Sequence, residues 1–390
     1  MEAEGLFESV PNFSEGRRQD VIAAIAGAAT AESHLLDVDP DPGHHRVVVS
    51  MAAQRARLLV AVMGAVSAAV ELIDVRAHEG VHPRVGAVDV VPIVPLGRST
   101  LNAARELARE IGERIWSDLR VPVYWYGEHR SLADIRAGRA KPDLGGPALH
   151  PTAGAVCVGA RLTLVAFNVL LPGLDVAKAR ALARSLRESQ GGMRGVKALV
   201  FELSGGRLQL SMNLFRVDET PPAAVVAELV RRGIKVGDQQ LVGLCPAIAA
   251  SAVAAGRLLE ARLAAAAARA GALRCRERAD EEGVALALRL DHEAEQLAAL
   301  GVDQSELLAG AERAAALAPV LRAARVQDGE LEAMLGAASR GLRAAISPAT
   351  RAAEKKRVEA LDARLSWTPP PHPPAAPGTS PASGEVNKPD

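Results

Sequence analysis

The first 126 residues alternate between short apolar runs and longer amphipathic stretches. The runs have the composition of β-strands, and in the stretches apolar residues return at helical spacing. The predicted order is β-α-β-β-α-β followed by α-β, which is a ferredoxin-like split βαβ unit with an extra crossover. Strands are expected at residues 6–10, 34–39, 46–53, 88–94 and 121–126, and helices at 17–30, 56–73 and 99–119.

The same order returns after residues 127–153, whose glycines, prolines and charges predict a linker or a mobile loop. Two half-size α+β units in tandem imply a cleft between them, which is a common location for a ligand. In the second unit, strands are expected at 162–171, 196–203, 207–215 and near 235–244, and helices at 175–190 and 221–233.

From Pro246 the composition changes, and Ala and Arg dominate as far as about Leu365. Helix starts are expected at Asp303, which forms a capping-box pattern with Glu306, and at Asp328. The last stretch is rich in Pro, Ser and Gly and is predicted to be disordered. The fold class is therefore α+β, with two tandem ferredoxin-like α/β-sandwich subdomains at 1–150 and 151–250, a helical extension at 251–366 and a disordered tail at 367–390.

Composition narrows the class of protein without identifying a function. The chain has 390 residues, 49% of them hydrophobic, with 46 basic and 46 acidic residues. A net charge of zero favours neither nucleic acid nor an acidic membrane as a partner. The three cysteines are too few and too scattered for a disulfide framework. Because we find no signal peptide and no long apolar segment, we expect a soluble cytoplasmic protein.

One short stretch, HEGVH at residues 78–82, matches the H-E-x-x-H pattern of zinc metalloproteases. That pattern needs an unbroken helix, because only helical geometry brings residues i and i+4 onto one metal ion. Gly80 lies inside the stretch and Pro83 follows it, so His82 is biased towards an extended conformation. We therefore predict a loop and no metal site.

A second set of motifs extends over residues 5–247 and consists of seven collinear stretches: VPNFSEG (Val10–Gly16), LLDVDP (Leu35–Pro40), LIDVRAHEGVHPRVGAVDV (Leu72–Val90), VPVYWYGE (Val121–Glu128), IRAG (Ile135–Gly138), GARLTLVAFN (Gly159–Asn168) and VGDQQLVGLCP (Val236–Pro246). Together they resemble the glutamate formimidoyltransferase family, the folate-dependent transferases of histidine degradation. In animals this family forms the N-terminal half of a fusion with formimidoyltetrahydrofolate cyclodeaminase. The resemblance implies two α+β subdomains with a folate-binding tunnel between them.

The resemblance further implies transfer of a formimino group from N-formimino-L-glutamate to N5 of tetrahydrofolate, the co-substrate. N5 attacks the amidine-like carbon, and the tetrahedral adduct collapses as the glutamate amine leaves. One proton must leave N5 and another must reach the departing nitrogen, and a histidine with an unperturbed pKa of about 6.5 suits both tasks. The family's acid/base histidine falls on His82, followed by Pro83, which stiffens the loop, and Gly86, which permits close backbone approach.

Arginines are expected to bind the carboxylates that both substrates carry. Arg46, Arg84 and Arg161 lie in or beside the matching stretches, and one or two of them should bind a ligand. Asp39 ends a predicted strand, where it orients His82 or contacts the pterin, or is a solvated turn carboxylate.

Further candidates are neutral polar residues. Asn12 and Ser14 lie in a strand-to-helix turn that suits a carboxylate ligand, although Ser14 can instead cap the helix. Asn168, Asn213 and Gln239 end or interrupt strands of the second unit, where an apolar residue is the default. They are predicted to line the cleft, with satisfied strand-end amides as the alternative.

The chain departs from the family pattern in three places. Val81 replaces a glutamate beside the acid/base histidine, the turn S-T-N-R reads GHHR at Gly43–Arg46, and the loop between Gly138 and Pro142 is shorter. The alternative function is therefore a diverged relative that binds reduced folate or uses another formyl or formimino donor. A homodimer is expected, and no nucleic acid, membrane or metal partner. The helical extension is a candidate oligomerisation or docking arm.

Overall fold

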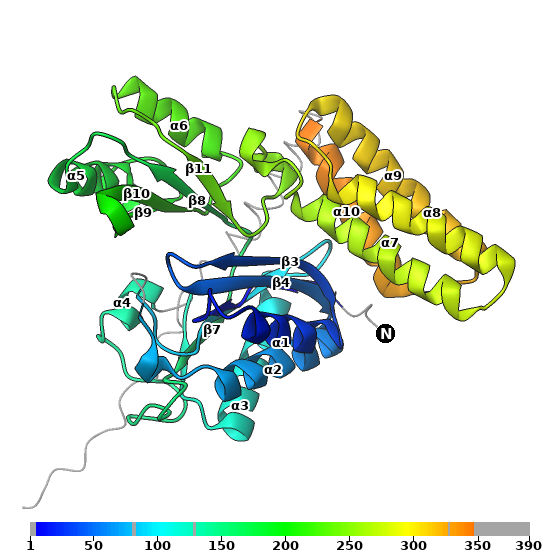
Figure 1. Ribbon diagram of the computed structural model, residues 1–390, viewed down its shortest axis with the longest axis horizontal. Helices are drawn as coiled ribbons and strands as arrows, with labels where there is room; N and C mark the ends of the chain where they lie inside the picture. Colours follow the sequence, from blue (N-terminus) through cyan, green and yellow to red (C-terminus); the bar gives the residue numbers. More distant parts are fainter. Residues whose placement is uncertain (1–4, 80–82, 128–129, 327, 347–390) are drawn as a thin grey trace, which may run out of the picture.

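The computed structural model describes residues 5–79, 83–127, 130–326 and 328–346. Its helices and strands form two α/β sandwiches and a bundle of helices (Figure 1). The predicted disordered tail at 367–390 and the end of the predicted helical extension lie outside the described residues. Among the described helices, none combines the length and the apolar character that crossing a membrane requires.

The first sandwich is built on a seven-stranded sheet. Strands β1 and β2 together form one interrupted strand between β4 and β5, and β3 pairs with β4 at one edge, all of them antiparallel. This is the predicted ferredoxin-like arrangement. The strands are β1 (Leu6–Ser9), β2 (Asn12–Phe13), β3 (His34–Asp41), β4 (Arg46–Gln54), β5 (Val88–Pro95), β6 (Val123–Trp125) and β7 (Val156–Ala160).

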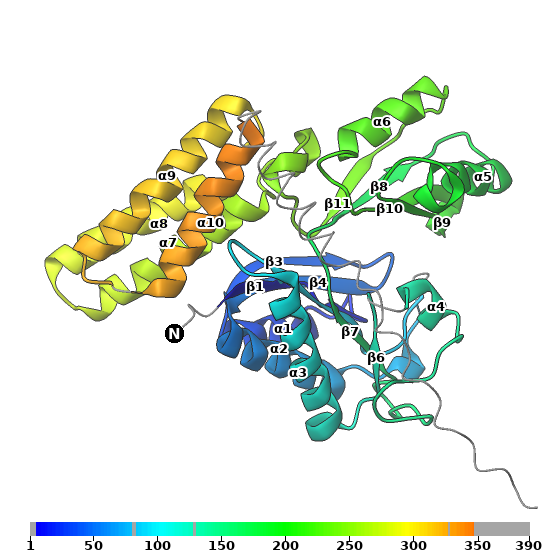
Figure 2. The ribbon, with the colours of Figure 1, turned by 180° about the vertical axis from the view of Figure 1, so that it is seen from behind.

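One face of this sheet is covered by helices α1 (Gln19–Thr30), α2 (Arg55–Leu72) and α3 (Leu101–Leu119). Phe7, Val49, Met51 and Ile93 alternate along the strands with residues of the other face, and all four lie in the core beneath these helices. We call the opposite surface the open face of the sheet. Figure 2 shows the three helices gathered on one side only.

The predicted boundary between the subdomains at residue 150 is corrected by β7. This strand pairs in parallel with both β5 and β6, so it completes the first sheet and the boundary falls after Ala160. The expected linker at 127–153 also contains a short helix, α4 (Leu132–Arg136). Strand β7 was missed because its short run of small residues, VCVGA, follows a segment whose glycines and prolines indicate a loop.

The second sandwich has the predicted β-α-β-β-α-β order and a fully antiparallel sheet with strand order β11-β8-β10-β9. Two helices cover one face, and their apolar residues share a core with alternate residues of the strands. The other face is open. The elements are β8 (Val165–Leu170), α5 (Val176–Leu186), β9 (Val196–Leu203), β10 (Arg207–Leu214), α6 (Pro222–Arg231) and β11 (Gln239–Val242).

The helical extension forms a bundle of four helices within the described residues: α7 (Leu259–Glu277), α8 (Glu281–Ala298), α9 (Gln304–Ala323) and α10 (Gly329–Ile346). The predicted capping box of Asp303 and Glu306 is confirmed at the start of α9. Asp328 accepts hydrogen bonds from the backbone N–H groups of Glu330 and Leu331 at the start of α10. The three cysteines, at 157, 245 and 275, are buried free thiols.

The bundle packs directly on the first sandwich. Leu6, Leu36 and Ala52 of the first sheet share an apolar cluster with α7 and α10. Beside this cluster, the side chain of Glu330 is 3% exposed and accepts a hydrogen bond of 2.7 Å from the backbone N–H of Gln54. The extension is therefore integrated with the sandwich at this surface, rather than tethered to it as a separate arm.

Candidate active site

A cleft of about 2200 Å³ lies between the open faces of the two sheets. Strand alternation directs one set of side chains into each core and the other set into the cleft. Typical ligand pockets measure about 300–1000 Å³, so the cleft has room for two substrates side by side. Its floor includes Glu8, Val10, Asn12, Arg46, Val48, Ser50, Val90 and Pro92, and its roof includes Asn168, Leu199, Phe201, Ser211 and Asn213.

Three further segments border the cleft or contact residues that line it. Helix α4 packs on an apolar cluster that contains Tyr124 and Tyr126, and Tyr126 also lines the cleft. The chain after β11 and the start of α7 border the cleft through Gly243 and Leu259. His44 reaches from the turn before β4 to the ring of Phe201, with ring centroids 5.4 Å apart.

Asp39 does not line the cleft. Its carboxylate accepts a 2.8 Å hydrogen bond from the backbone N–H of Gly243 and lies 2.8 Å from the guanidinium of Arg257, which also contacts Asp37 at 3.0 Å. These bonds fasten the segment between the second sheet and the bundle to the edge strand of the first sheet. In the structure, Asp39 thus contacts the protein itself rather than the cleft.

Ser14 does not cap α1. Its hydroxyl is buried and donates a 2.7 Å hydrogen bond to the carbonyl of Gly86, so it ties the strand-to-helix turn to the loop that follows His82. Glu15 instead holds the turn that precedes the helix, because its carboxylate accepts the backbone N–H groups of Gly16, Arg17 and Arg18 at 2.9–3.1 Å. The N–H groups that were expected to bind a carboxylate ligand are therefore already occupied.

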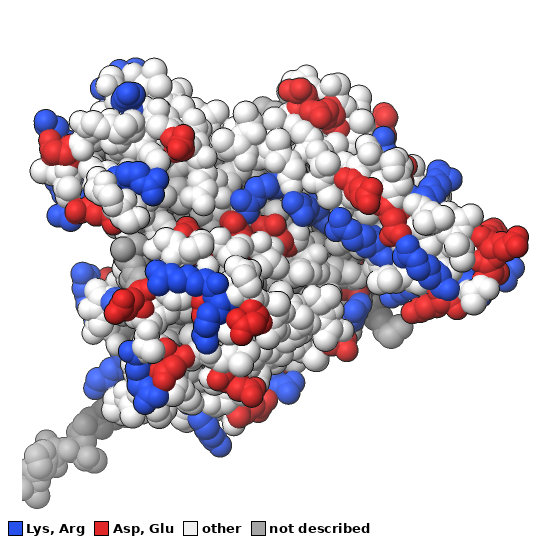
Figure 3. Space-filling view, in the orientation of Figure 1, with Lys and Arg blue, Asp and Glu red and all other residues white. Residues whose placement is uncertain are grey.

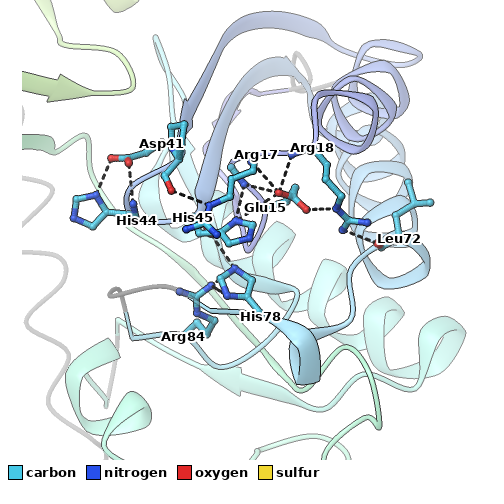
Figure 4. Close-up of polar contacts among 11 residues, drawn as sticks. Glu15, Arg17, Arg18, Asp41, His44, His45, Leu72, His78 and Arg84 are labelled. Carbon is cyan, nitrogen blue, oxygen red and sulfur yellow. Dashed lines mark hydrogen bonds and ion pairs between the residues drawn. The ribbon is translucent and has the colours of Figure 1, made fainter. Parts of the chain in front are cut away.

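The carboxyl group of Glu15 is stabilised in its ionised form. Burial acts to raise the pKa of this carboxyl, but the backbone N–H groups of Arg17 and Arg18 and the Arg18 guanidinium lower it to about 2. Figure 4 shows Glu15 between these donors on one side and His45 on the other. Glu15 is thus ionised at any physiological pH and acts as a structural anion in the turn.

The stretch that resembles a zinc motif is not helical where it is described, because the 3-10 turn Val75–Ala77 ends before His78. The imidazole of His78 contacts Arg84 and the carbonyl of His45, at 3.0 Å for the latter, and its ring lies 4.1 Å from that of His45 (Figure 4). In the described part of the chain, no group of three or more His, Cys, Asp or Glu side chains is placed to hold a metal ion. His82 lies outside the described residues, and Pro83, which follows it, lines the cleft.

Burial also lowers the pKa values of His45 and His78. Burial and the neighbouring charge of His78 lower the pKa of His45 to about 4. Burial and the positive charge of Arg84 likewise lower the pKa of His78. Both imidazoles are therefore neutral near pH 7, in contrast to an ion-paired histidine.

Arg46 lies on the floor as predicted, and burial lowers the pKa of its guanidinium while Asp89 and Asp41 oppose that shift. Asp89 also forms a close ion pair with Arg136 and accepts the backbone N–H of Val85 at 2.9 Å. The floor therefore carries a positive cluster held by one buried carboxylate. Arg136 was not predicted, although it lies in the IRAG stretch.

Arg161 lines the cleft near the end covered by α4. Its side chain donates to the carbonyl of Leu162 at 3.1 Å, and its backbone N–H donates to Ile93 at 3.0 Å. Arg84, the third predicted arginine, contacts His78 and is not among the residues that line the cleft. Two of the three predicted arginines thus lie where a ligand in the cleft can reach them.

Glu8 is a site residue that sequence reasoning missed. It lies on the floor of the cleft with 4% of its surface exposed. Burial raises its pKa to about 7, the positive charge of Arg161 opposes this shift, and the carboxylate of Glu260 on α7 adds to it. The available signal was a glutamate within the short apolar strand LFES, where a charged residue is unusual.

The second sheet confirms the placement of two predicted amides. Asn168 and Asn213 both line the roof, and Asn168 is buried. Gln239 does not line the cleft, because it lies opposite Val169, which belongs to the core face. Its neighbour Gln240 lies opposite Asn168, with their side-chain amides 3.5 Å apart. The strand was predicted without its register, and an error of one residue exchanges the two faces.

Two open-faced α/β sandwiches around a cleft that arginines help to line define a two-subdomain α/β protein with a ligand-sized site between its subdomains. The family model described as "Formiminotransferase domain, N-terminal subdomain" matches residues 6–161. The chain is 34% identical over 268 residues to a glutamate formimidoyltransferase of Thermoplasma acidophilum, covering 62% of this chain and 88% of that protein. The chain therefore belongs to the glutamate formimidoyltransferase family.

Other relatives agree with this assignment. A glutamate formimidoyltransferase of Streptococcus pyogenes is 35% identical over 273 residues, covering 62% of this chain and 89% of that protein. The formimidoyltransferase-cyclodeaminase of Sus scrofa is 36% identical over 272 residues, which is 62% of this chain and 50% of the fused protein. Among solved structures, a microcompartments protein from Desulfitobacterium hafniense matches with a TM-score of 0.19 and 11% identity. The match covers 61% of this chain and 94% of the microcompartments protein. Structural similarity at this level supports no argument about fold or function.

Proposed function

We propose that this protein transfers the formimino group of N-formimino-L-glutamate to N5 of tetrahydrofolate, producing 5-formiminotetrahydrofolate and glutamate, as a step of histidine degradation. Relatives that carry the name glutamate formimidoyltransferase support this reaction. The observation that carries it for this chain is the large cleft between two open sheet faces, which has room for both substrates. Tetrahydrofolate is a co-substrate here, and the reaction needs no metal.

The reaction has a balanced course. The lone pair of N5 attacks the formimino carbon, and the resulting tetrahedral adduct breaks its bond to the glutamate nitrogen. The proton lost from N5 and the proton gained by the leaving amine require an acid/base group at the site. We assign this role to His82, which lies outside the described residues but is followed by Pro83 at the edge of the cleft.

The described residues that follow His82 are held by several contacts. Gly86 lies so close to the neighbouring chain that an added Cβ atom would be 2.0 Å from the carbonyl oxygen of Ala155. Ser14 bonds the carbonyl of the same glycine, and Asp89 bonds the backbone N–H of Val85. These contacts fix the chain from Val85 to Gly86, and this supports a positioned acid/base group shortly before it.

Charge complementarity supports the binding mode. Both substrates carry carboxylates, and Arg46, Arg136 and Arg161 present guanidinium groups at the floor of the cleft. We propose that these arginines bind substrate carboxylates, with Asn12, Asn168 and Asn213 as further polar contacts. On the face shown in Figure 3, Lys and Arg are interspersed with Asp and Glu, in contrast to the arginines gathered at the floor of the cleft.

The test is a reaction of the purified protein with formiminoglutamate and tetrahydrofolate, monitored by the absorbance of the folate product after cyclisation. Product formation is expected, and His82→Ala is expected to lower turnover by about 10²–10⁴-fold with the fold intact. Tight binding of tetrahydrofolate without product would instead indicate the diverged, non-transferring relative. Turnover of the alanine variant near the wild-type value would contradict the role given to His82.

A further inference from the structure

Glu8 occupies an unusual position for a carboxylate. In β1 it lies opposite Ala52 of β4 and Val94 of β5, in the middle of the first sheet. Its neighbours Phe7 and Ser9 point into the core, so Glu8 points to the open face, where it lines the cleft. Within the described part of the chain, the cleft is the space that this carboxylate borders, so a ligand in the cleft can reach it.

The carboxylate of Glu8 has no hydrogen-bond donor among the described residues. Burying an ionisable group without donors is costly, so a protein that keeps one in a cleft normally satisfies it with a ligand. Arg161 is near enough to influence Glu8 electrostatically, but its guanidinium donates to the carbonyl of Leu162. Since none of the described residues donates to Glu8, a molecule bound in the cleft can supply the donors that this carboxylate lacks.

A second buried polar group lies beside it. Ser50 lines the same floor with 1% of its surface exposed, and its hydroxyl has no hydrogen-bond partner within the described chain. On β4 it is two residues from Ala52, the residue opposite Glu8, so both side chains are on the open face. The apolar residues Val10, Val48 and Pro92 line the same floor. Apolar side chains together with the polar groups of Glu8 and Ser50 fit a heterocycle that has an apolar face and a polar edge.

We propose that Glu8 binds the pterin ring of tetrahydrofolate by accepting the paired N–H donors of its N3 and its 2-amino group, with the ring lying on the apolar floor. The two donors of a 2-amino-4-oxopyrimidine are parallel and match the two oxygens of a carboxylate. This inference rests on the proposed function, because it assigns the folate subsite of that reaction. The formimino group of the donor substrate has similar paired N–H chemistry, and the experiment below distinguishes the two.

The electrostatics support the same assignment. The charged or titratable groups that act on Glu8 are Arg161, which favours the carboxylate, and Glu260 on α7, which disfavours it. Tyr126 lies near Arg161, and burial keeps its pKa above its ordinary value, so it stays neutral. With a pKa of about 7, Glu8 is half protonated in the free protein near neutrality. Because only the carboxylate accepts both donors, folate binding should weaken about tenfold for each pH unit below 7.

The decisive experiment is a cycle that combines one variant with one ligand analogue. Glu8→Gln keeps the shape of the side chain but turns one oxygen into a donor that opposes a pterin N–H. Dissociation constants are measured by calorimetry for tetrahydrofolate and for its 2-desamino-2-methyl analogue, with both proteins, between pH 5.5 and 8. The matched control is Glu312→Gln, the same change at an exposed glutamate of α9.

We expect Glu8→Gln to raise the Kd of tetrahydrofolate by about 10–100-fold, as for loss of a hydrogen-bonded charge, and to leave the Kd of the analogue nearly unchanged. The pH dependence of tetrahydrofolate binding should disappear in the same variant. Its melting temperature should equal or exceed that of the wild type, because no internal partner is lost.

Other outcomes overturn the assignment. An equal loss of affinity for both ligands would make Glu8 a structural residue. An unchanged Kd for tetrahydrofolate together with a raised KM for formiminoglutamate would show that Glu8 binds the formimino group of the donor substrate instead. If the wild type binds tetrahydrofolate through Glu8 but forms no product, the proposed function fails while this subsite stands.

Discussion

The most informative test of how the helical extension is attached is the substitution Glu330→Ala. Glu330 is 3% exposed, accepts the backbone N–H of Gln54 at 2.7 Å, and forms a close ion pair with Arg57. The alanine leaves the N–H of Gln54 without its partner in a partly buried place, which costs about 1–3 kcal/mol. The ion pair adds at most about 1 kcal/mol, because the Arg57 side chain is 38% exposed and therefore screened by solvent. We expect a total loss of about 2–3 kcal/mol in the free energy of unfolding.

The assay is urea unfolding followed by circular dichroism, with amide hydrogen exchange at β4 and at the start of α10. Glu332→Ala is the matched control, because Glu332 is two residues further along the same helix, is 37% exposed and contacts Arg322 at 3.0 Å. That variant should lose less than about 1 kcal/mol. If the two alanine variants differ by less than about 0.5 kcal/mol, the reasoning about Glu330 is wrong.

The pH dependence of this contact gives an independent check. Burial acts to raise the pKa of Glu330, but His34, the Gln54 N–H and Arg57 together lower it below its ordinary value of 4.5. A carboxyl whose pKa is lowered by folding stabilises the folded state above its unfolded pKa and loses that contribution as pH falls through the folded pKa. The stability difference between the wild type and Glu330→Gln should therefore be complete near neutrality and shrink below pH 4.5.

Two further predictions concern the cleft. Glu260→Gln removes a negative charge that raises the pKa of Glu8, so the pH below which tetrahydrofolate binding weakens should fall from about 7. Calorimetry across pH measures this midpoint. An unchanged profile would show that Glu260 does not act on Glu8. Gly86→Ala places a Cβ atom 2.0 Å from the carbonyl oxygen of Ala155, so it should destabilise the fold by about 1–3 kcal/mol and lower turnover by moving the loop of His82. Alanine at Gly27, where an added Cβ meets nothing within 4 Å, is its control, and equal stability of the two variants would contradict the argument.

The element order could be predicted from sequence because each sandwich repeats a strong local pattern. The strands β3, β4 and β5 alternate or run apolar over eight or nine residues, and the helices between them are amphipathic. Strand β7 is different, since its pairing with β5 connects residues far apart in the chain and leaves only a five-residue local signal. Local patterns therefore predict elements, and they do not predict which sheet a short strand joins.

The candidate site was predicted in part for a similar reason. Four predicted residues line the cleft: Arg46, Arg161, Asn168 and Asn213. They could be predicted because polar residues that interrupt or end an apolar strand are visible in the sequence. The prediction that Gln239 lines the cleft was wrong because the register of β11 is set by its pairing with β8, which the sequence does not show. Asp39 and Ser14 are polar for structural reasons, and sequence alone cannot separate a carboxylate that anchors a segment from one that binds a ligand.

The attachment of the bundle and the chemistry of the cleft depend on one segment. Helix α7 begins at the cleft, where Leu259 lines the wall and the next residue, Glu260, acts on Glu8. Glu260 also accepts the backbone N–H of Ala247 at 2.8 Å, so its position is set by the chain that leaves the second sheet. Because Glu330 anchors the far end of the same bundle on β4, loss of that anchor should alter the pH profile of folate binding as well as stability. A bundle that served only as a tether between molecules would change neither.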